Sequence, residues 1–251
     1  MQSPFDLALD GFVATITLNR PAKHNLLTVE DLGPLGALLD RAAASGARVL
    51  IVTGMGTRSF SAGIDLGDIL ATDWSRNPLE ALIDKVEAFP LPTIAAMNGF
   101  AYGGAADLAL ACDFRLGVEG MRVAMPPARL GVMLHVSGLR RFATRTGANA
   151  ARRLLVAGET LDAAELHRVG YLDRVVAPDA LAAEARALAD NIAALAPLAV
   201  QGMKKALAAI ERNDVDLPAL KAAILALFSS ADLREGLAAF AAKRPPRFTG
   251  S

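Results

Sequence analysis

Two glycine-containing segments carry backbone N–H groups at points where a strand is expected to lead into a helix. The first is 59–66 (SFSAGIDL) and the second is 98–107 (NGFAYGGAAD). The first N–H groups of a helix have no acceptor within it, and Gly104 lets a ligand approach the main chain without a Cβ in the way. Two such donors converging on one point would form an oxyanion hole, in which each donor contributes roughly 10²–10³ in rate.

Asp107 and His135 are the side chains that could move a proton near such a hole. Asp107 lies three residues after Gly104 and therefore on the same helix face. We expect burial to raise the pKa of Asp107 toward that of a usable base. His135 follows a third segment, 125–131 (MPPARLG), and taken alone it equally fits a hydrogen-bonded core histidine.

Other interpretations fit parts of this pattern. Glycines in strand-to-helix turns often serve only the backbone. The loop 54–59 (GMGTRS) resembles a dinucleotide fingerprint, although Ser59 replaces the third glycine and Asp73 is a weak candidate for the acidic ribose ligand. Ser61 could be the nucleophile of a hydrolase triad with Asp107 or Asp113 and His135, although the first glycine of the nucleophile elbow is missing.

Alternating strand and helix patterns must position these residues. The patterns predict strands over 13–18, 48–53, 92–97, 114–118 and 172–176, and helices that begin near 28, 78 and 103. This alternation favours an α/β fold with parallel strand pairing. After 179 only helices are expected, over 179–194, 197–212, 217–229 and 231–241. We therefore divide the chain into a core, 1–195, that holds the site and a helical C-terminal region, 196–251.

Composition excludes several classes of protein. The 251 residues include 26 Lys+Arg and 26 Asp+Glu, and 53% are apolar, so neither a disordered chain nor a nucleic-acid partner is expected. No apolar run reaches the ~20 residues of a spanning helix, and residues 1–10 lack the features of a signal peptide, which predicts a cytoplasmic protein without a membrane partner. The single cysteine, Cys112, is expected to be buried and inert, and no metal site is indicated.

Five segments in the same order resemble the crotonase (enoyl-CoA hydratase/isomerase) superfamily: 13–21 (VATITLNRP), 60–66 (FSAGIDL), 94–104 (IAAMNGFAYGG), 130–132 (LGV) and 235–244 (EGLAAFAAKR). The resemblance implies an α/β fold built as a spiral of ββα units, with a C-terminal helical region that forms a homotrimer or a dimer of trimers. It also implies an acyl-CoA substrate in fatty acid metabolism and an enolate held by two backbone N–H groups. No cofactor is implied, because coenzyme A is part of the substrate.

The same resemblance assigns roles by position. The oxyanion donors would be Ile64 and Gly104, and the acid/base candidates would be Asp107 and His135. His135 falls where some relatives, including a dienoyl-CoA isomerase and a dehalogenase, carry a functional aspartate. The acyl-CoA would lie along Lys23, His24, Leu26, Ala62, Gly63, Asp65, Leu66, Gly103, Pro127, Leu130 and Gly131.

Two departures from the superfamily bear on the reaction. Hydratases of this superfamily carry two glutamates that hold and activate a water, and here those positions are Asp107 and Pro127. Hydration needs one group that takes a proton from water and another that delivers a proton to carbon, so we expect isomerase-type chemistry on Asp107 or His135. A malonyl-type decarboxylase, an acyl-CoA hydrolase and a non-catalytic acyl-CoA-binding protein are the alternatives. The His and Tyr that methylmalonyl-CoA decarboxylase places in its site would be Ile64 and Leu134.

Overall fold

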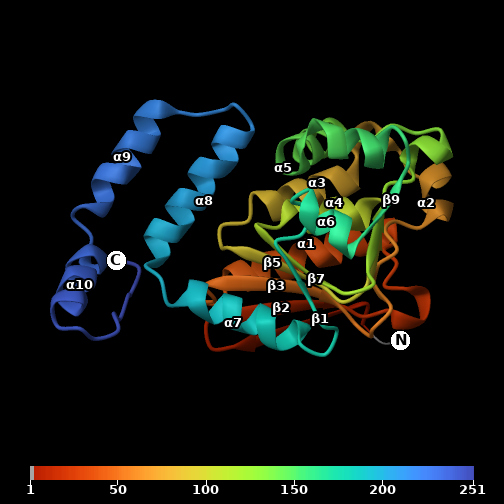
Figure 1. Ribbon diagram of the computed structural model, residues 1–251. Coiled ribbons are helices and arrows are strands. Elements are labelled where there is room, and N and C mark those ends of the chain that lie inside the picture. Colours follow the sequence, from red (N-terminus) through yellow and green to blue (C-terminus); the bar gives the residue numbers. More distant parts are fainter. Residues whose placement is uncertain (1–2) are drawn as a thin grey trace.

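The computed structural model describes residues 3–251 and contains two sheets (Figure 1). The larger sheet has the strand order β1-β2-β3-β5-β7-β10, and β1 is its antiparallel strand. Its strands are β1 (Phe5–Asp10), β2 (Val13–Leu18), β3 (Val49–Gly54), β5 (Thr93–Met97), β7 (Phe114–Val118) and β10 (Arg174–Val176). The smaller sheet consists of β4 (Ser59–Ser61), β6 (Phe100–Tyr102), β8 (Arg122–Ala124) and β9 (Thr160–Asp162).

The chain passes repeatedly from the larger sheet to the smaller one. After β3, β5 and β7 it enters β4, β6 and β8 in turn, and the neighbouring strands of these two sets pair in parallel. Parallel neighbours need a crossover, which helices supply. The path is thus the spiral α/β arrangement that the sequence predicts.

Helices cover both faces of the larger sheet. They are α1 (Val29–Ala43), α2 (Leu66–Ala71), α3 (Pro78–Glu87), α4 (Gly104–Ala111), α5 (Val136–Leu155), α6 (Ala163–Arg168), α7 (Leu181–Ala193), α8 (Pro197–Glu211), α9 (Leu217–Leu227) and α10 (Ala231–Ala241). In Figure 1, α7 lies beneath the sheet, where it contacts β3 and β5, while α3, α4 and α5 contact one another in series above it. Helices α8–α10 extend to one side of this body.

The predicted strands correspond to β2, β3, β5, β7 and β10, and the predicted helices to α1, α3, α4 and α7–α10. The strand β1, the smaller sheet and the helices α2, α5 and α6 were not predicted. Strands of three residues are too short to display an alternating pattern, and α5 is interrupted at Gly147, whose φ is 78°. Cys112 is buried as predicted, and burial raises the pKa of its thiol to about 11. No described helix is both long enough and apolar enough to cross a membrane.

Hydrogen bonds of the Asn25 side chain connect the loop before α1 to the segment between β3 and β4. This side chain, 1% exposed, accepts a hydrogen bond from the Arg20 N–H (3.0 Å) and donates to the carbonyls of Met55 (3.0 Å) and Ser59 (2.9 Å). Beyond it, the Ala62 N–H donates to the His24 carbonyl at 2.9 Å. The loop 20–27 is therefore held directly beside residues 62–64.

Replacing Asn25 with alanine should lower the free energy of unfolding by about 3 kcal/mol, because three buried hydrogen bonds of about 1 kcal/mol each are lost. Asn213→Ala is the matched control, since Asn213 also has a positive φ (53°) but is exposed, and its side-chain amide has no hydrogen bond among residues 3–251. Urea unfolding of both variants measures the difference. Equal losses would show that the left-handed backbone conformation, and not the buried amide, accounts for the effect.

Candidate active site

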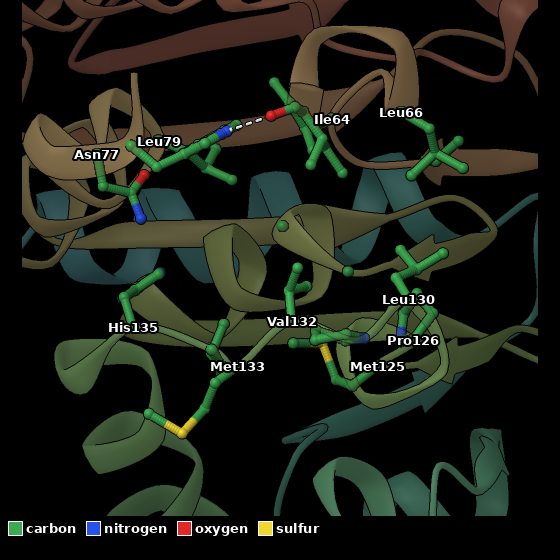
Figure 2. Close-up of a pocket in the computed structure, with 17 residues that line it drawn as sticks. Ile64, Leu66, Asn77, Leu79, Met125, Pro126, Leu130, Val132, Met133 and His135 are labelled. Atoms are coloured by element: carbon green, nitrogen blue, oxygen red, sulfur yellow. Dashed lines mark hydrogen bonds between the residues drawn. The ribbon is translucent and has the colours of Figure 1, made fainter. Parts of the chain in front are cut away.

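A cavity of about 320 Å³ lies where the ends of β4 and β6 meet α3 and the segment before α5. Figure 2 shows Asn77, Leu79, Ile64 and Leu66 along one side, facing His135, Val132, Leu130 and other residues along the opposite side. The lining is mostly apolar, as expected for a site that takes up a hydrophobic ligand. It comprises Ala62, Ile64, Leu66, Ile69, Trp74, Asn77, Leu79, Gly103, Gly104, Met125, Pro126, Pro127, Leu130, Val132, Met133, Leu134 and His135.

The two glycine segments come together at this cavity. A Cβ on Gly63 would lie 2.4 Å from the Tyr102 carbonyl oxygen and 3.4 Å from the Gly104 nitrogen, so the two main chains are nearly in contact. Gly63 has φ 87° and Gly103 has φ 54°, a region that L side chains rarely adopt. Both glycines are therefore required by the backbone, which turns immediately before Ile64 and Gly104.

The N–H groups of Ile64 and Gly104 are available to a ligand. On either side of Ile64, the Gly63 N–H donates to Ser61 Oγ and the Asp65 N–H to the Leu27 carbonyl, but the Ile64 N–H donates to no group among residues 3–251. Gly104 is the first residue of α4 and has no helical carbonyl one turn before it. Two free donors beside one cavity fit the geometry of an oxyanion hole.

Asp107 lies behind the cavity and is not part of its lining. Its side chain is 0% exposed, and it accepts hydrogen bonds from Arg141 Nε to Oδ1 (2.9 Å) and from Arg141 Nη2 to Oδ2 (3.2 Å). The fully buried Arg141 also contacts Asp84 at 2.8 Å and Glu87 at 3.2 Å. Asp107 is thus one member of a buried ion-pair network that joins α3, α4 and α5.

The expected pKa shift of Asp107 was wrong in sign. Burial alone would raise the pKa of this carboxyl, but the contacts of His135 and Arg141 outweigh burial and hold it below its ordinary value. The guanidinium of Arg141 was not anticipated, because Arg141 lies 34 residues away on α5, a helix that the sequence analysis did not predict. Asp107 is therefore ionised at neutral pH, and with its lowered pKa it is a weaker base than a free carboxylate.

His135 connects Asp107 to the cavity. Its Nε2 lies 3.0 Å from Asp107 Oδ2, although without the alignment of a good hydrogen bond, and its Nδ1 accepts the Gly138 N–H at 3.1 Å. The neutral ring therefore carries its proton on Nε2, beside the carboxylate. A Cβ on Gly138 would lie 2.8 Å from Asp107 Oδ2 and 2.9 Å from His135 Cε1, so this close packing requires glycine.

The predicted site residues fall into three groups. The cavity is lined by Ala62, Ile64, Leu66, Gly103, Gly104, Pro127, Leu130 and His135. Directly next to lining residues in the sequence are Gly63, Asp65 and Gly131. Outside the lining are Lys23, His24, Leu26 and Asp107. Trp74, Asn77 and Leu79 come from the segment 74–86, whose position was not predictable from sequence. Apolar residues such as Ile69 and Met133 gave no signal, because nothing distinguishes them from core residues before the fold is known.

The rival interpretations do not fit the structure. Ser61 is buried, donates to the Asn25 carbonyl (2.7 Å) and accepts from the Gly63 N–H (3.1 Å), so it is not a nucleophile paired with His135. The loop after β3 leads into β4 and not into a helix, so it offers no helix N-terminus to a pyrophosphate. Residues 3–251 contain no cluster of His, Cys, Asp and Glu that could hold a metal ion.

Comparisons with known proteins agree with this fold. The profile of the Enoyl-CoA hydratase/isomerase family matches residues 10–251. The 2,3-dehydroadipyl-CoA hydratase of Escherichia coli is 34% identical over 246 residues and covers 95% of both chains. The (E)-benzylidenesuccinyl-CoA hydratase of Thauera aromatica is 31% identical over 257 residues, which cover 99% of this chain and 100% of that one. The crystal structure of enoyl-CoA hydratase from Bacillus anthracis superimposes with a TM-score of 0.91 at 30% identity, covering 99% of this chain and 100% of that one.

The spiral fold is therefore that of the crotonase class of enzymes. Within that class, the chain belongs to the enoyl-CoA hydratase/isomerase family and is an enzyme of this family.

The lowered pKa of Asp107 can be tested through the pH dependence of the protein's stability. A carboxyl with a folded-state pKa below its ordinary value of 3.8 adds stability above that value and loses it as the pH falls through the folded pKa. Asp107→Asn should therefore lower the free energy of unfolding by about 3 kcal/mol, because Arg141 loses a buried partner. In urea unfolding, the destabilisation should be present at about pH 5 and shrink only in stronger acid. A stabilising effect of Asp107→Asn at neutral pH would mean that the pKa is raised instead.

Proposed function

We propose that the enzyme binds an acyl-CoA thioester with its carbonyl oxygen between the N–H groups of Ile64 and Gly104, and that it stabilises the resulting enolate. The free donors beside an apolar cavity support this, since an enolate oxygen carries the charge that such donors hold best. The acyl group would lie against lining residues such as Trp74, Leu79 and Met133. The thioester would be flanked by Ala62, Gly63, Asp65, Leu66, Gly103, Leu130 and Gly131.

Coenzyme A would lie along the loop before α1. Lys23, His24 and Leu26 belong to this loop, and its backbone pairs with the segment 62–64 through the hydrogen bonds from Ala62 to His24 and from Leu27 to Gly63. The Lys23 ammonium is exposed there and could meet a phosphate. No cofactor besides the substrate's own coenzyme A enters the proposal.

Among the reactions of enolates, isomerisation of a 3-enoyl thioester fits the site best. The observation that carries this conclusion is that His135 is the one titratable side chain among the cavity-lining residues of the described chain. Hydration needs two proton-transfer groups near a water, whereas Pro127 cannot ionise and Asp107 is bound to Arg141. A proton shift between two carbons needs a single base, which His135 would supply through Nδ1.

Decarboxylation of a malonyl-type thioester is the second candidate, and a specific contact favours it. Nδ1 of His135 already accepts the Gly138 N–H, so it must give up that bond, at a cost of about 1 kcal/mol, before it takes a proton from carbon. Loss of CO₂ produces the enolate without any base. Only the oxyanion hole and a later proton donor are then needed.

We also propose that α8–α10 mediate assembly into a homotrimer or a dimer of trimers, with the boundary between the core and this region at residues 195 and 196. Large apolar side chains on these helices are exposed in the single chain, among them Met203, Leu207, Leu225, Phe228 and Phe240. Exposed apolar surface of this extent is typical of faces that another subunit covers.

The reaction can be assigned by measuring turnover of 3-enoyl-, 2-enoyl- and malonyl-type thioesters. We expect the 3-enoyl thioester to be the best substrate, and we expect His135→Ala to reduce its turnover about 10²–10⁴-fold, the range of a general base. His167→Ala is the matched control, because His167 lies outside the cavity lining and contacts the Leu172 carbonyl.

Other outcomes would indicate a different reaction or the absence of catalysis. Malonyl-type turnover that survives His135→Ala would favour decarboxylation, and rapid hydration of the 2-enoyl thioester would contradict the proposal. Coenzyme A affinity without turnover of any thioester would indicate a binding protein. Free coenzyme A released from a saturated acyl thioester would indicate hydrolysis.

A further inference from the structure

Glu80 is a carboxylate close to the cavity that neither motif nor family resemblance singles out. It lies in the first turn of α3, where its N–H donates to the side chain of the cavity-lining Asn77 at 3.0 Å. Its own side chain is 31% exposed, whereas that of Asp107 is completely buried. Glu80 can therefore exchange protons with water, and Asp107 cannot.

A hydroxyl joins Glu80 to the histidine. Ser137 Oγ donates to Glu80 Oε1 at 3.0 Å and lies 3.0 Å from His135 Nδ1, and Glu80 Oε1 is itself 3.4 Å from Nδ1. Nδ1 is also the ring nitrogen that faces away from Asp107. A continuous chain of polar atoms thus runs from His135, through Ser137, to a partly exposed carboxylate.

The charges around the imidazole come from three helices. Asp107 of α4 lies at Nε2 and Glu80 of α3 lies near Nδ1. Arg141 of α5 neutralises Asp107 and approaches Ser137 Oγ at 3.5 Å, while Asp84, one turn after Glu80, contacts Arg141 and not His135. When Nδ1 is protonated, it can donate to Ser137 Oγ, which already donates to Glu80.

We propose that Glu80 and Ser137 form a proton relay between His135 and solvent. The inference rests on the proposed function, in which His135 takes a proton from the substrate. In that step the C2–H bond breaks, its electron pair becomes the dienolate and the proton binds Nδ1. The Nδ1 proton then moves to Ser137 Oγ as the Ser137 hydroxyl proton moves to Glu80, which releases it to water. The reverse transfers bring a solvent proton to Nδ1 and then to C4.

Glu80 acts through Ser137 and His135, so it is a positioning residue of the proton path and does not touch substrate. Replacing Glu80 should change the source of the hydrogen at C4 of the product more than it changes the binding of the substrate. In D₂O, wild-type enzyme should form product labelled at C4, because Nδ1 equilibrates with solvent during turnover. Glu80→Gln and Ser137→Ala should continue to convert substrate, but most of the deuterium should be lost from the product.

Asp84→Asn is the matched control, since it removes a carboxylate from the same helix without removing one that faces His135. This variant should keep the wild-type deuterium fraction. A Glu80→Gln product that carries as much deuterium as the wild-type product would overturn the relay.

A second measurement does not depend on turnover. The chain has three histidines, so the ring signals of His135 can be identified in the NMR spectrum by their loss in His135→Ala. Removing the Glu80 charge should move the midpoint of the His135 titration to lower pH in Glu80→Gln, and Asp84→Asn should move it less. An unchanged midpoint in Glu80→Gln would overturn the relay. If no thioester is turned over but this midpoint moves, the proposed reaction fails while the pairing of Glu80 with His135 stands.

Discussion

Asp107 is a carboxylate with no exposed surface, and it is stable there because Arg141 and His135 occupy both of its oxygens. An unpaired charge in such a place would cost several kcal/mol, so α4 and α5 must pack in the register that brings these groups together. Asp84 and Glu87 contact the same guanidinium, which ties α3 to the pair. The three helices that border the cavity are therefore fixed relative to one another by one ion-pair network centred on Asp107 and Arg141.

The same interaction separates the proposed roles of Asp107 and His135. Because the contacts with His135 and Arg141 lower the pKa of Asp107, this carboxylate holds the His135 ring, and in the proposed reaction the histidine carries out proton transfer. The proposed oxyanion donors depend on a separate constraint, the alternation of the chain between two sheets, which brings Ile64 and Gly104 beside one cavity. In the proposed mechanism, the backbone that stabilises charge and the side chain that transfers the proton thus come from different parts of the fold.

Much of this was predictable from sequence, and the failures have physical causes. The buried strands β2, β3 and β5 and the turns at Gly63 and Gly104 follow from local patterns, whereas only the resemblance to the superfamily indicated a place at the site for His135. The smaller sheet was not predictable, because its three-residue strands are specified by their neighbours and not by their own periodicity. Arg141 and Glu80 resemble ordinary charged residues of amphipathic helices until α3 and α5 are placed against α4. The predicted pKa of Asp107 was wrong because neither the contact with His135 nor that with Arg141 is visible in the sequence.

The central claim is that an acyl thioester binds with its carbonyl oxygen at the two backbone donors and its reacting carbon beside His135. A crystal structure with a non-hydrolysable acyl-CoA analogue tests it most directly. We predict that the carbonyl oxygen lies about 3 Å from both the Ile64 and Gly104 nitrogens, with C2 closer to His135 Nδ1 than to Asp107. An oxygen more than about 3.5 Å from both nitrogens would contradict the account.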